Sequence, residues 1–183
     1  MIRPIFSTGI SVHTLKNVNN SEIVEYVKAN NNFNKPKDIY KILSEPIFKN
    51  LNNIIEHKIN EHYHETYNNK FKAVLLEAWG NSGNDSIITM PHIHTTGFIS
   101  AVYYPHATEG YLTFLNPMVG LLSKQDINMI DEHSPYTSEC FSYPSKTGAL
   151  IIFNSLLMHF VRCESNNDRV SLAYNATVKE LNA

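Results

Sequence analysis

The chain has 183 residues, which suits one domain with a single hydrophobic core. Its formal net charge is only -2 and its charged residues are scattered, so nothing in the electrostatics predicts a nucleic acid or an anionic membrane as a partner. The two cysteines, Cys140 and Cys163, form no Cys-x-x-Cys pair. This argues against a disulfide framework or a thiolate zinc site and predicts a reducing, cytoplasmic location. The sequence starts without the apolar core of a signal peptide. It contains no apolar stretch of about 18 residues, so no membrane span is expected.

The first part of the chain, residues 1–70, has the apolar spacing of helices. Residues 21–28 begin with Ser21, a good N-cap residue, and place apolar side chains on one face. A second, longer helix is expected to begin near Ser44 as its N-cap, with Pro46 in the first turn. Its apolar residues keep helical spacing and are Ile47, Phe48, Leu51, Ile54, Ile55 and Ile59. We therefore expect residues 1–70 to form a helical support region that packs against a sheet.

After residue 70 the pattern changes to short β-rich runs that are separated by turn residues. Eight runs predict strands, at residues 71–79, 87–94, 98–104, 111–115, 139–143, 149–153, 159–163 and 170–178. Residues 81–85 predict a turn, and residues 118–138 have no clear period, which is typical of a functional or mobile loop. With no helices between them, such strands favour a sandwich or barrel over a parallel α/β sheet. We expect a mainly β (α+β) fold with one domain over residues 1–183, whose β core spans residues 71–183.

Among the nine histidines, His92 and His94 form a His-x-His pair within an expected strand. Residues i and i+2 of a strand point to the same face, so His92 and His94 would project two imidazoles into the same space. Such a pair suits a first-row metal such as iron, zinc, copper or nickel. Two exposed or core histidines without a metal are the alternative, and the pair alone does not decide between them.

A third histidine and an arginine follow near the C-terminus. His159 and Arg169 lie ten positions apart on two expected strands joined by the polar residues 164–168, so we expect a hairpin that sets them side by side. In the second strand Arg169 and Ser171 share one face, and the guanidinium is buried if that face is turned to the barrel interior. A buried guanidinium needs a planar anion, and a carboxylate held by two hydrogen bonds is the natural one. That carboxylate would belong either to a ligand or to a protein Asp or Glu.

In their order and spacing these residues resemble the 2-oxoglutarate- and Fe(II)-dependent oxygenases, and most closely the small bacterial and phage members of that superfamily. The resemblance covers most of the chain from Trp79 to Asn175. Its pieces are PHIHTTGFISAVYYP at 91–105, GYLTFLNP at 110–117, the segment 144–153, and RVSLAYN at 169–175. It implies a double-stranded β-helix (jelly roll) with the N-terminal helices packed on one sheet.

The resemblance also implies the residues of the site. Fe(II) is expected to be held by His92, His94 and His159. The co-substrate 2-oxoglutarate is expected to be held by Arg169, Ser171, Tyr104 (with Tyr103 as the alternative) and Asn175. Of these, the three histidines and Arg169 are the expected catalytic residues.

One position departs from the superfamily, whose first two ligands are usually a His-x-Asp or His-x-Glu pair. Here His94 stands in the place of the carboxylate. A third imidazole keeps the number of ligands but removes one negative charge, which makes the bound iron more electrophilic. Whether His94 is a metal ligand is therefore the question that most needs structural evidence.

The expected activity is that of an Fe(II)- and 2-oxoglutarate-dependent dioxygenase, most simply a hydroxylase. Two alternatives stay open at this point. One is a cupin-like three-His metal dioxygenase or lyase that does not use 2-oxoglutarate, and the other is a non-catalytic jelly-roll binding module. The sequence specifies neither the substrate, small-molecule or peptidyl, nor the oligomeric state.

Overall fold

The structure is a computed structural model that describes residues 8–30, 41–67, 70–83, 89–118, 137–162 and 169–180. Over these residues the strands are β1 (Ile10–Thr14), β2 (Phe71–Gly83), β3 (Thr89–His92), β4 (Ile99–His106), β5 (Tyr111–Leu115), β6 (Cys140–Pro144), β7 (Ala149–Asn154), β8 (His159–Arg162) and β9 (Arg169–Glu180). The helices are α1 (Asn20–Asn30), α2 (Lys41–Ser44), the 3-10 helix η1 (Pro46–Phe48) and α3 (Lys49–Thr66).

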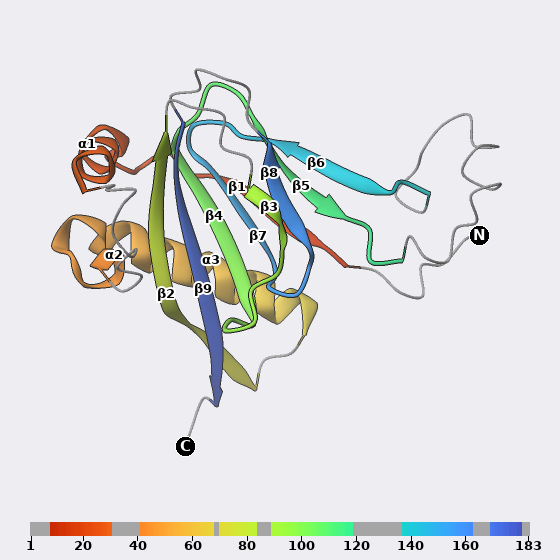
Figure 1. Cartoon of the computed structure of the whole chain (residues 1–183). Helices are drawn as coiled ribbons and strands as arrows, with labels where there is room; N and C mark the ends of the chain where they lie inside the picture. The colour runs from red at the N-terminus through yellow and green to blue at the C-terminus, as the bar shows by residue number, and fades with distance from the viewer. Residues whose placement is uncertain are drawn as a thin grey trace.

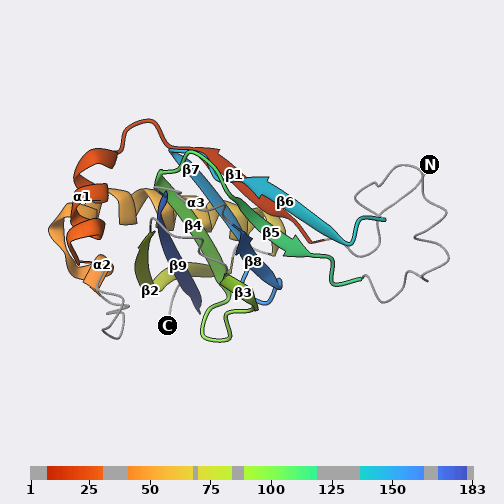
Figure 2. The ribbon, with the colours of Figure 1, turned by 45° about the horizontal axis from the view of Figure 1, so that its top comes forward.

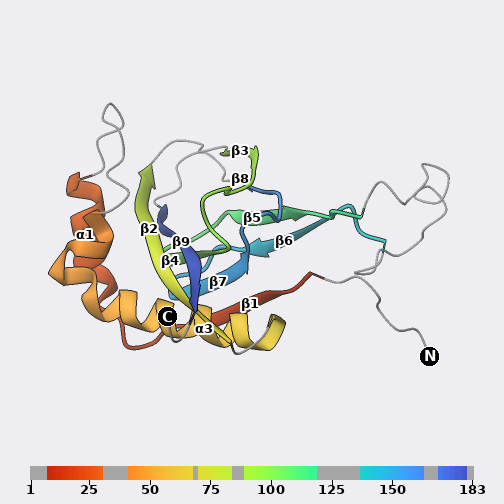
Figure 3. The ribbon, with the colours of Figure 1, turned by 90° about the horizontal axis from the view of Figure 1, so that it is seen from below.

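The strands form two antiparallel sheets, which Figure 1 shows side by side. One has five strands in the order β1-β7-β4-β9-β2, and the other has four in the order β3-β8-β5-β6. In Figure 3 the helix α3 lies on one side of the five-stranded sheet and the four-stranded sheet lies on the other. This arrangement confirms the expected jelly roll with helices packed on one sheet.

Alternation along β9 separates two cores. Val170 and Leu172 face the helices and belong to the larger apolar cluster, while Arg169 and Ser171 face the space between the sheets. The smaller cluster lies between the sheets and is made of Tyr104, Ala107, Leu112, Phe114, Ala149, Ile151, Phe153 and Leu157. The expected alternation in β9 is confirmed, and it is what brings a charged side chain to the inside of the barrel.

The helices differ from the sequence expectation at one boundary. Ser44 is the last residue of α2 and donates its hydroxyl to the carbonyl of Lys41 (3.1 Å), so it does not cap the long helix, which begins at Lys49. The reason is Pro46, which holds the preceding Glu45 in an extended conformation (φ -74°, ψ 131°) and starts the 3-10 turn. Helices α1 and α2 lie at the end of the molecule opposite β6 (Figure 2). Within the described residues no helix is long and apolar enough to cross a bilayer.

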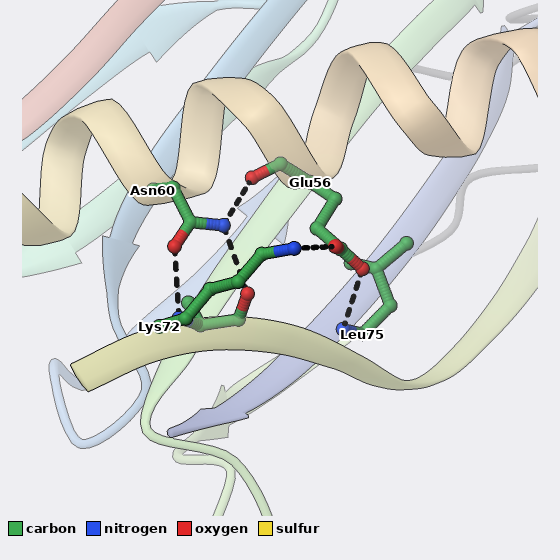
Figure 4. Close-up of polar contacts among 5 residues, drawn as sticks. Glu56, Asn60, Lys72 and Leu75 are labelled. Atoms are coloured by element: carbon green, nitrogen blue, oxygen red, sulfur yellow. Dashed lines mark hydrogen bonds and ion pairs between the residues drawn. The ribbon is translucent and has the colours of Figure 1, made fainter. Parts of the chain in front are cut away.

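Helix α3 covers the free edge of β2 with two polar side chains (Figure 4). Asn60 accepts a hydrogen bond from the backbone N–H of Ala73 (2.9 Å) and donates to its carbonyl (2.8 Å), as a neighbouring strand would. Glu56 accepts from the backbone N–H of Leu75 (3.3 Å) and forms an ion pair with Lys72 (3.2 Å). An edge strand with open hydrogen-bonding groups invites wrong pairing, and these contacts close it.

Three further expectations need correction or lie outside the described residues. The strand β1 was not expected, because the first 70 residues were assigned to helices. Residues 81–83 continue β2 and are not a turn. Of the irregular segment at 118–138, residues 119–136 lie outside the described part of the chain.

Candidate active site

Three histidines come together between the two sheets. His92 ends β3 and His159 begins β8, and the two are directly paired in the ladder between these strands. His94 follows β3 by two residues. One ring nitrogen from each histidine lies within 4.8 Å of the other two, and in the described ranges no other group of His, Cys, Asp and Glu meets this criterion.

Hydrogen bonds at Nδ1 leave Nε2 as the available nitrogen in each ring. The Nδ1 atoms of His92 and His159 each lie 2.8 Å from the backbone carbonyl two residues earlier, and His94 Nδ1 lies 2.8 Å from Asn175 Oδ1. These oxygens only accept, so each Nδ1 donates and each Nε2 keeps its lone pair. The Nε2 atoms of His92 and His94 are 3.2 Å apart. Two nitrogens that bind one metal ion at about 2.1 Å have a similar separation.

Burial keeps two of the three imidazoles neutral. The pKa of His159 is lowered to about 4, mainly by burial, with smaller contributions from the neighbouring His92 and His94. The pKa of His94 is lowered for the same main reason and by His92. Because an imidazole must be unprotonated to bind a metal, neither ring has to lose a proton near pH 7.

The position of His94 does not come from strand alternation, as the sequence analysis assumed. The strand β3 ends at His92, and His94 is held by other contacts. Its backbone N–H donates to the carbonyl of Ser155 (2.9 Å), and its ring stacks on Trp79 with the ring centroids 5.5 Å apart. The expectation of two converging imidazoles is right, but the second one is placed by tertiary contacts.

A β-bulge in β2 turns Trp79 toward this site. The register of β2 against β9 shifts between Leu75 and Glu77. Before the bulge Ala73 and Leu75 face the helices, and after it Ala78 does, so Glu77 and Trp79 face the space between the sheets. Bulges are known to redirect side chains next to functional sites in this way.

Arg169 lies in the five-stranded sheet, across the cavity from His159 in the four-stranded sheet. The expected hairpin between the two residues is therefore wrong: β9 pairs with β2 and β4, while β8 pairs with β3 and β5. The side chain of Arg169 is only 5 % exposed, and its Nη1 atom has no hydrogen-bond partner in the described part of the chain. A buried guanidinium nitrogen in this state can donate a charge-assisted hydrogen bond to an anion.

One cavity of about 160 Å³ joins the histidines to the arginine. His92, His94, His159, Arg169 and Ser171 all line it, and they come from both sheets. Its other walls are partly apolar, with Trp79, Ala101, Val102, Leu112, Phe153, Val161 and Ala173 among the lining residues.

The two tyrosines that were candidates for the co-substrate lie on opposite faces of β4. Tyr104 belongs to the core between the sheets, and its ring centroid is 5.9 Å from the guanidinium carbon of Arg169. Tyr103 faces the helices, where its hydroxyl donates to Asn20 Oδ1 (2.6 Å). The alternative assignment of Tyr103 to the site is therefore corrected, because adjacent residues of a strand cannot face the same side.

Asn175 contacts His94 and does not line the cavity. It is 1 % exposed, and its amide lies between His94 and the carboxylate of Glu77, to which it donates (2.6 Å). Glu77 was not expected at the site, and its only signal in the sequence is that it is an acidic residue in an apolar run, two positions before Trp79. The described strands therefore do contain a buried acidic residue, but it pairs with Thr96 and Asn175 and not with Arg169.

A family of proteins described as "Putative 2OG-Fe(II) oxygenase" matches residues 77–175, which is more than half of the chain. The chain belongs to this family. The matched range contains all three histidines and Arg169, and it begins at Glu77 and ends at Asn175. Among curated protein sequences, none matches this oxygenase.

Several solved structures have the same fold as this oxygenase. HygX from Streptomyces hygroscopicus, with nickel and 2-oxoglutarate bound, is 14 % identical with a TM-score of 0.56, over 93 % of this chain and 82 % of HygX. The epimerase SnoN from nogalamycin biosynthesis is 12 % identical with a TM-score of 0.60, over 93 % and 76 %. A prolyl-4-hydroxylase from Pseudomonas putida is 11 % identical with a TM-score of 0.56, over 93 % and 89 %. At these identities the likeness concerns the fold.

The residues of the oxygenase fit the cofactors of its family. One nitrogen from each of the three imidazoles lies within 4.8 Å of the other two, and imidazole is a suitable ligand for iron. The buried Nη1 of Arg169 and the hydroxyl of Ser171 face the same cavity and suit the carboxylate of 2-oxoglutarate. The site contains no carboxylate ligand among the described residues, so its metal would keep one more positive charge than in a two-His, one-carboxylate centre.

Proposed function

We propose that this oxygenase is a hydroxylase in which His92, His94 and His159 hold Fe(II) and Arg169 holds 2-oxoglutarate. Bound together, iron and 2-oxoglutarate supply the oxidising power that inserts one atom of dioxygen into a C–H bond, while 2-oxoglutarate becomes succinate and carbon dioxide. Hydroxylation is the simplest outcome of this chemistry. The solved structures of the same fold include an epimerase as well as a prolyl hydroxylase.

One observation carries the proposal. Three imidazoles with available Nε2 atoms face a single cavity together with a buried arginine whose Nη1 has no partner among the described residues. A metal alone would need only the histidines. A bidentate organic acid that binds a metal at one end and an arginine at the other needs both.

Each side chain then has a defined task. Arg169 binds the far carboxylate, the Ser171 hydroxyl donates to it, and Tyr104 packs its ring beside the guanidinium. Phe153 packs against His159 with ring centroids 4.7 Å apart. Apolar walls of this kind exclude water, which strengthens the charged contacts inside the cavity.

The metal assignment is tested by His159→Ala, with His57→Ala as its control. His57 is another histidine, but it lies on the surface of α3 with 71 % of its side chain exposed. After anaerobic loading with Fe(II), His57→Ala should bind one equivalent of iron as the wild type does, and His159→Ala should bind little. Full iron occupancy in His159→Ala would contradict the assignment.

The reaction class is tested by product analysis. Iron-loaded wild-type protein should convert 2-oxoglutarate to succinate in the presence of dioxygen, slowly without substrate and faster with it. A substrate found by this acceleration should gain 16 mass units, and isotopic dioxygen should label the new hydroxyl. A product that has gained no oxygen would contradict hydroxylation and would indicate that the same centre catalyses another reaction.

We also propose that the protein acts in the cytoplasm, since its Cys140 is exposed and unpaired among the described residues, as is usual in a reducing compartment. Cell fractionation with an antibody to the native protein tests this location. Recovery in a secreted or membrane fraction would contradict it.

A further inference from the structure

Behind His94 lies a buried polar network, of which Ser100 also lines the cavity. Its members are Glu77 (9 % exposed), Asn175 (1 %) and Ser100 (1 %). Burying a carboxylate and an amide costs free energy unless their hydrogen bonds are satisfied. We therefore asked what these buried polar groups do. Their role follows from the contact between Asn175 and His94.

The amide of Asn175 is held in one orientation by its neighbours. Its Nδ2 lies 2.6 Å from Glu77 Oε1, while its Oδ1 accepts from the hydroxyl of Ser100 (2.7 Å) and lies 2.8 Å from His94 Nδ1. A carboxylate accepts hydrogen bonds and has none to donate, so the amide must turn its NH2 group toward Glu77. Its oxygen then faces His94.

This orientation decides the tautomer of His94. An amide oxygen can only accept, so Nδ1 of His94 must carry the proton and Nε2 must be free. If the amide were reversed, its NH2 group would face Nδ1, which would then accept, and the proton would move to Nε2. That proton would point at Nε2 of His92, 3.2 Å away, and would block a shared metal.

Glu77 is itself fixed in place. Thr96 donates its hydroxyl to the same Oε1 atom (2.6 Å), and the β-bulge between Leu75 and Glu77 turns the carboxylate to the inner side of β2. His92 and His159 have no such dependence, because backbone carbonyls accept from their Nδ1 atoms. Among the three histidines, only His94 has its tautomer set by side chains.

We propose that Glu77 is a positioning residue that selects the metal-binding tautomer of His94 by fixing the amide of Asn175. The inference rests on the proposed iron site, and it explains how the chain uses an imidazole in place of the usual carboxylate. A carboxylate can bind a metal through either oxygen, whereas an imidazole must have the correct tautomer and ring direction. The supporting partner of a metal-bound histidine is commonly worth 10–100-fold in metal affinity.

Two substitutions at one position test the proposal. Glu77→Met has a similar size but no strong acceptor, so the amide of Asn175 is free to reverse. Glu77→Gln removes the charge but keeps an oxygen that accepts from Asn175 and Thr96, so it should restore the wild-type behaviour. Both are compared with wild type as whole, metal-free protein and then with metal added.

The first readout is the tautomer, measured by long-range 1H–15N NMR of the histidine rings at pH 8 without metal. In the wild type and in Glu77→Gln, His94 should have its proton on Nδ1. In Glu77→Met the signal of His94 should shift toward the Nε2–H form while His92 and His159 stay unchanged, which also shows that the site is still folded. An Nε2–H form of His94 in the wild type would overturn the proposal without any variant.

The second readout is the dissociation constant for Co(II), measured by competition with a coloured chelator. Affinity should fall about 10–100-fold in Glu77→Met and less than about 3-fold in Glu77→Gln. Equal affinity in wild type and Glu77→Met would refute the role of Glu77, even if 2-oxoglutarate is turned over. Conversely, a failure of wild type to turn over 2-oxoglutarate would refute the proposed function and leave the tautomer and Co(II) results valid.

Discussion

Replacing Arg169 separates the binding of 2-oxoglutarate from the binding of iron. The guanidinium is 5 % exposed and has an unpaired Nη1 within the described structure, so it is ready for an anion and contacts none of the three histidines in a hydrogen bond. In Arg169→Ala the co-substrate loses its charged partner, while the histidine rings keep the hydrogen bonds that orient them. Iron should therefore stay bound.

The size of the loss follows from the contact. A carboxylate held by a guanidinium gains two charge-assisted hydrogen bonds, each worth about 1.5–3 kcal/mol. Since part of this is offset by water that enters the cavity of the variant, we expect a loss of at least about 2–3 kcal/mol in binding, or roughly 30- to 150-fold. Arg169→Lys keeps the charge but not the planar pair of donors, so its loss should be intermediate.

Anaerobic calorimetry of iron-loaded protein with 2-oxoglutarate measures this directly. The control is Arg162→Ala, which removes an exposed arginine at the end of β8 and should bind as the wild type does. The reasoning is refuted if Arg169→Ala binds 2-oxoglutarate as tightly as the wild type. It is also refuted if the variant loses its iron, because Arg169 would then support the metal site itself.

Three more predictions concern His159, Tyr103 and Asn60. The pKa of His159 is about 4 in the folded protein against about 6.5 when unfolded, so the unfolded state binds the extra proton. Metal-free protein should lose up to about 3 kcal/mol of stability as pH falls from 6.5 to 4, and urea unfolding of His159→Gln should show a smaller loss. Tyr103→Phe removes the hydroxyl that donates to Asn20 and should cost about 1 kcal/mol, yet 2-oxoglutarate affinity should not change; a weaker affinity would return Tyr103 to the site. Asn60→Ala opens the edge of β2 at Ala73 and should lower the unfolding free energy by about 1–3 kcal/mol in urea, and an unchanged value would mean that this edge needs no cover.

The strands after residue 70 could be predicted because their side chains alternate against two different environments. In β9, Val170 and Leu172 pack toward the helices, and Arg169 and Ser171 face the cavity, as the sequence pattern indicates. The strand β1 was missed because its polar residues face the helix: the Ser11 hydroxyl is hydrogen-bonded to the ring of His62 in α3, while Val12 stays 37 % exposed. In β1 the side that packs on the protein is polar and is held by this hydrogen bond, and an apolar periodicity in a single sequence does not detect such a strand.

The sequence predicted that the three histidines and Arg169 lie close together, but not how the chain arranges them. The histidines and Arg169 were identified, yet the short segment between His159 and Arg169 suggested a hairpin where the chain in fact changes sheet. The bulge that turns Glu77 inward was also invisible, because one extra residue in a strand leaves the apolar pattern almost unchanged. Both features depend on which strands are neighbours, and that is decided by packing across the whole barrel.

The central claim is that one centre in this chain binds iron and 2-oxoglutarate together. It is tested most directly by adding 2-oxoglutarate, without dioxygen, to protein loaded with one equivalent of Fe(II), and by recording the visible absorption. The account predicts a weak charge-transfer band that saturates at one equivalent of 2-oxoglutarate and is absent from His159→Ala. Iron-loaded wild-type protein that develops no such band would contradict the claim.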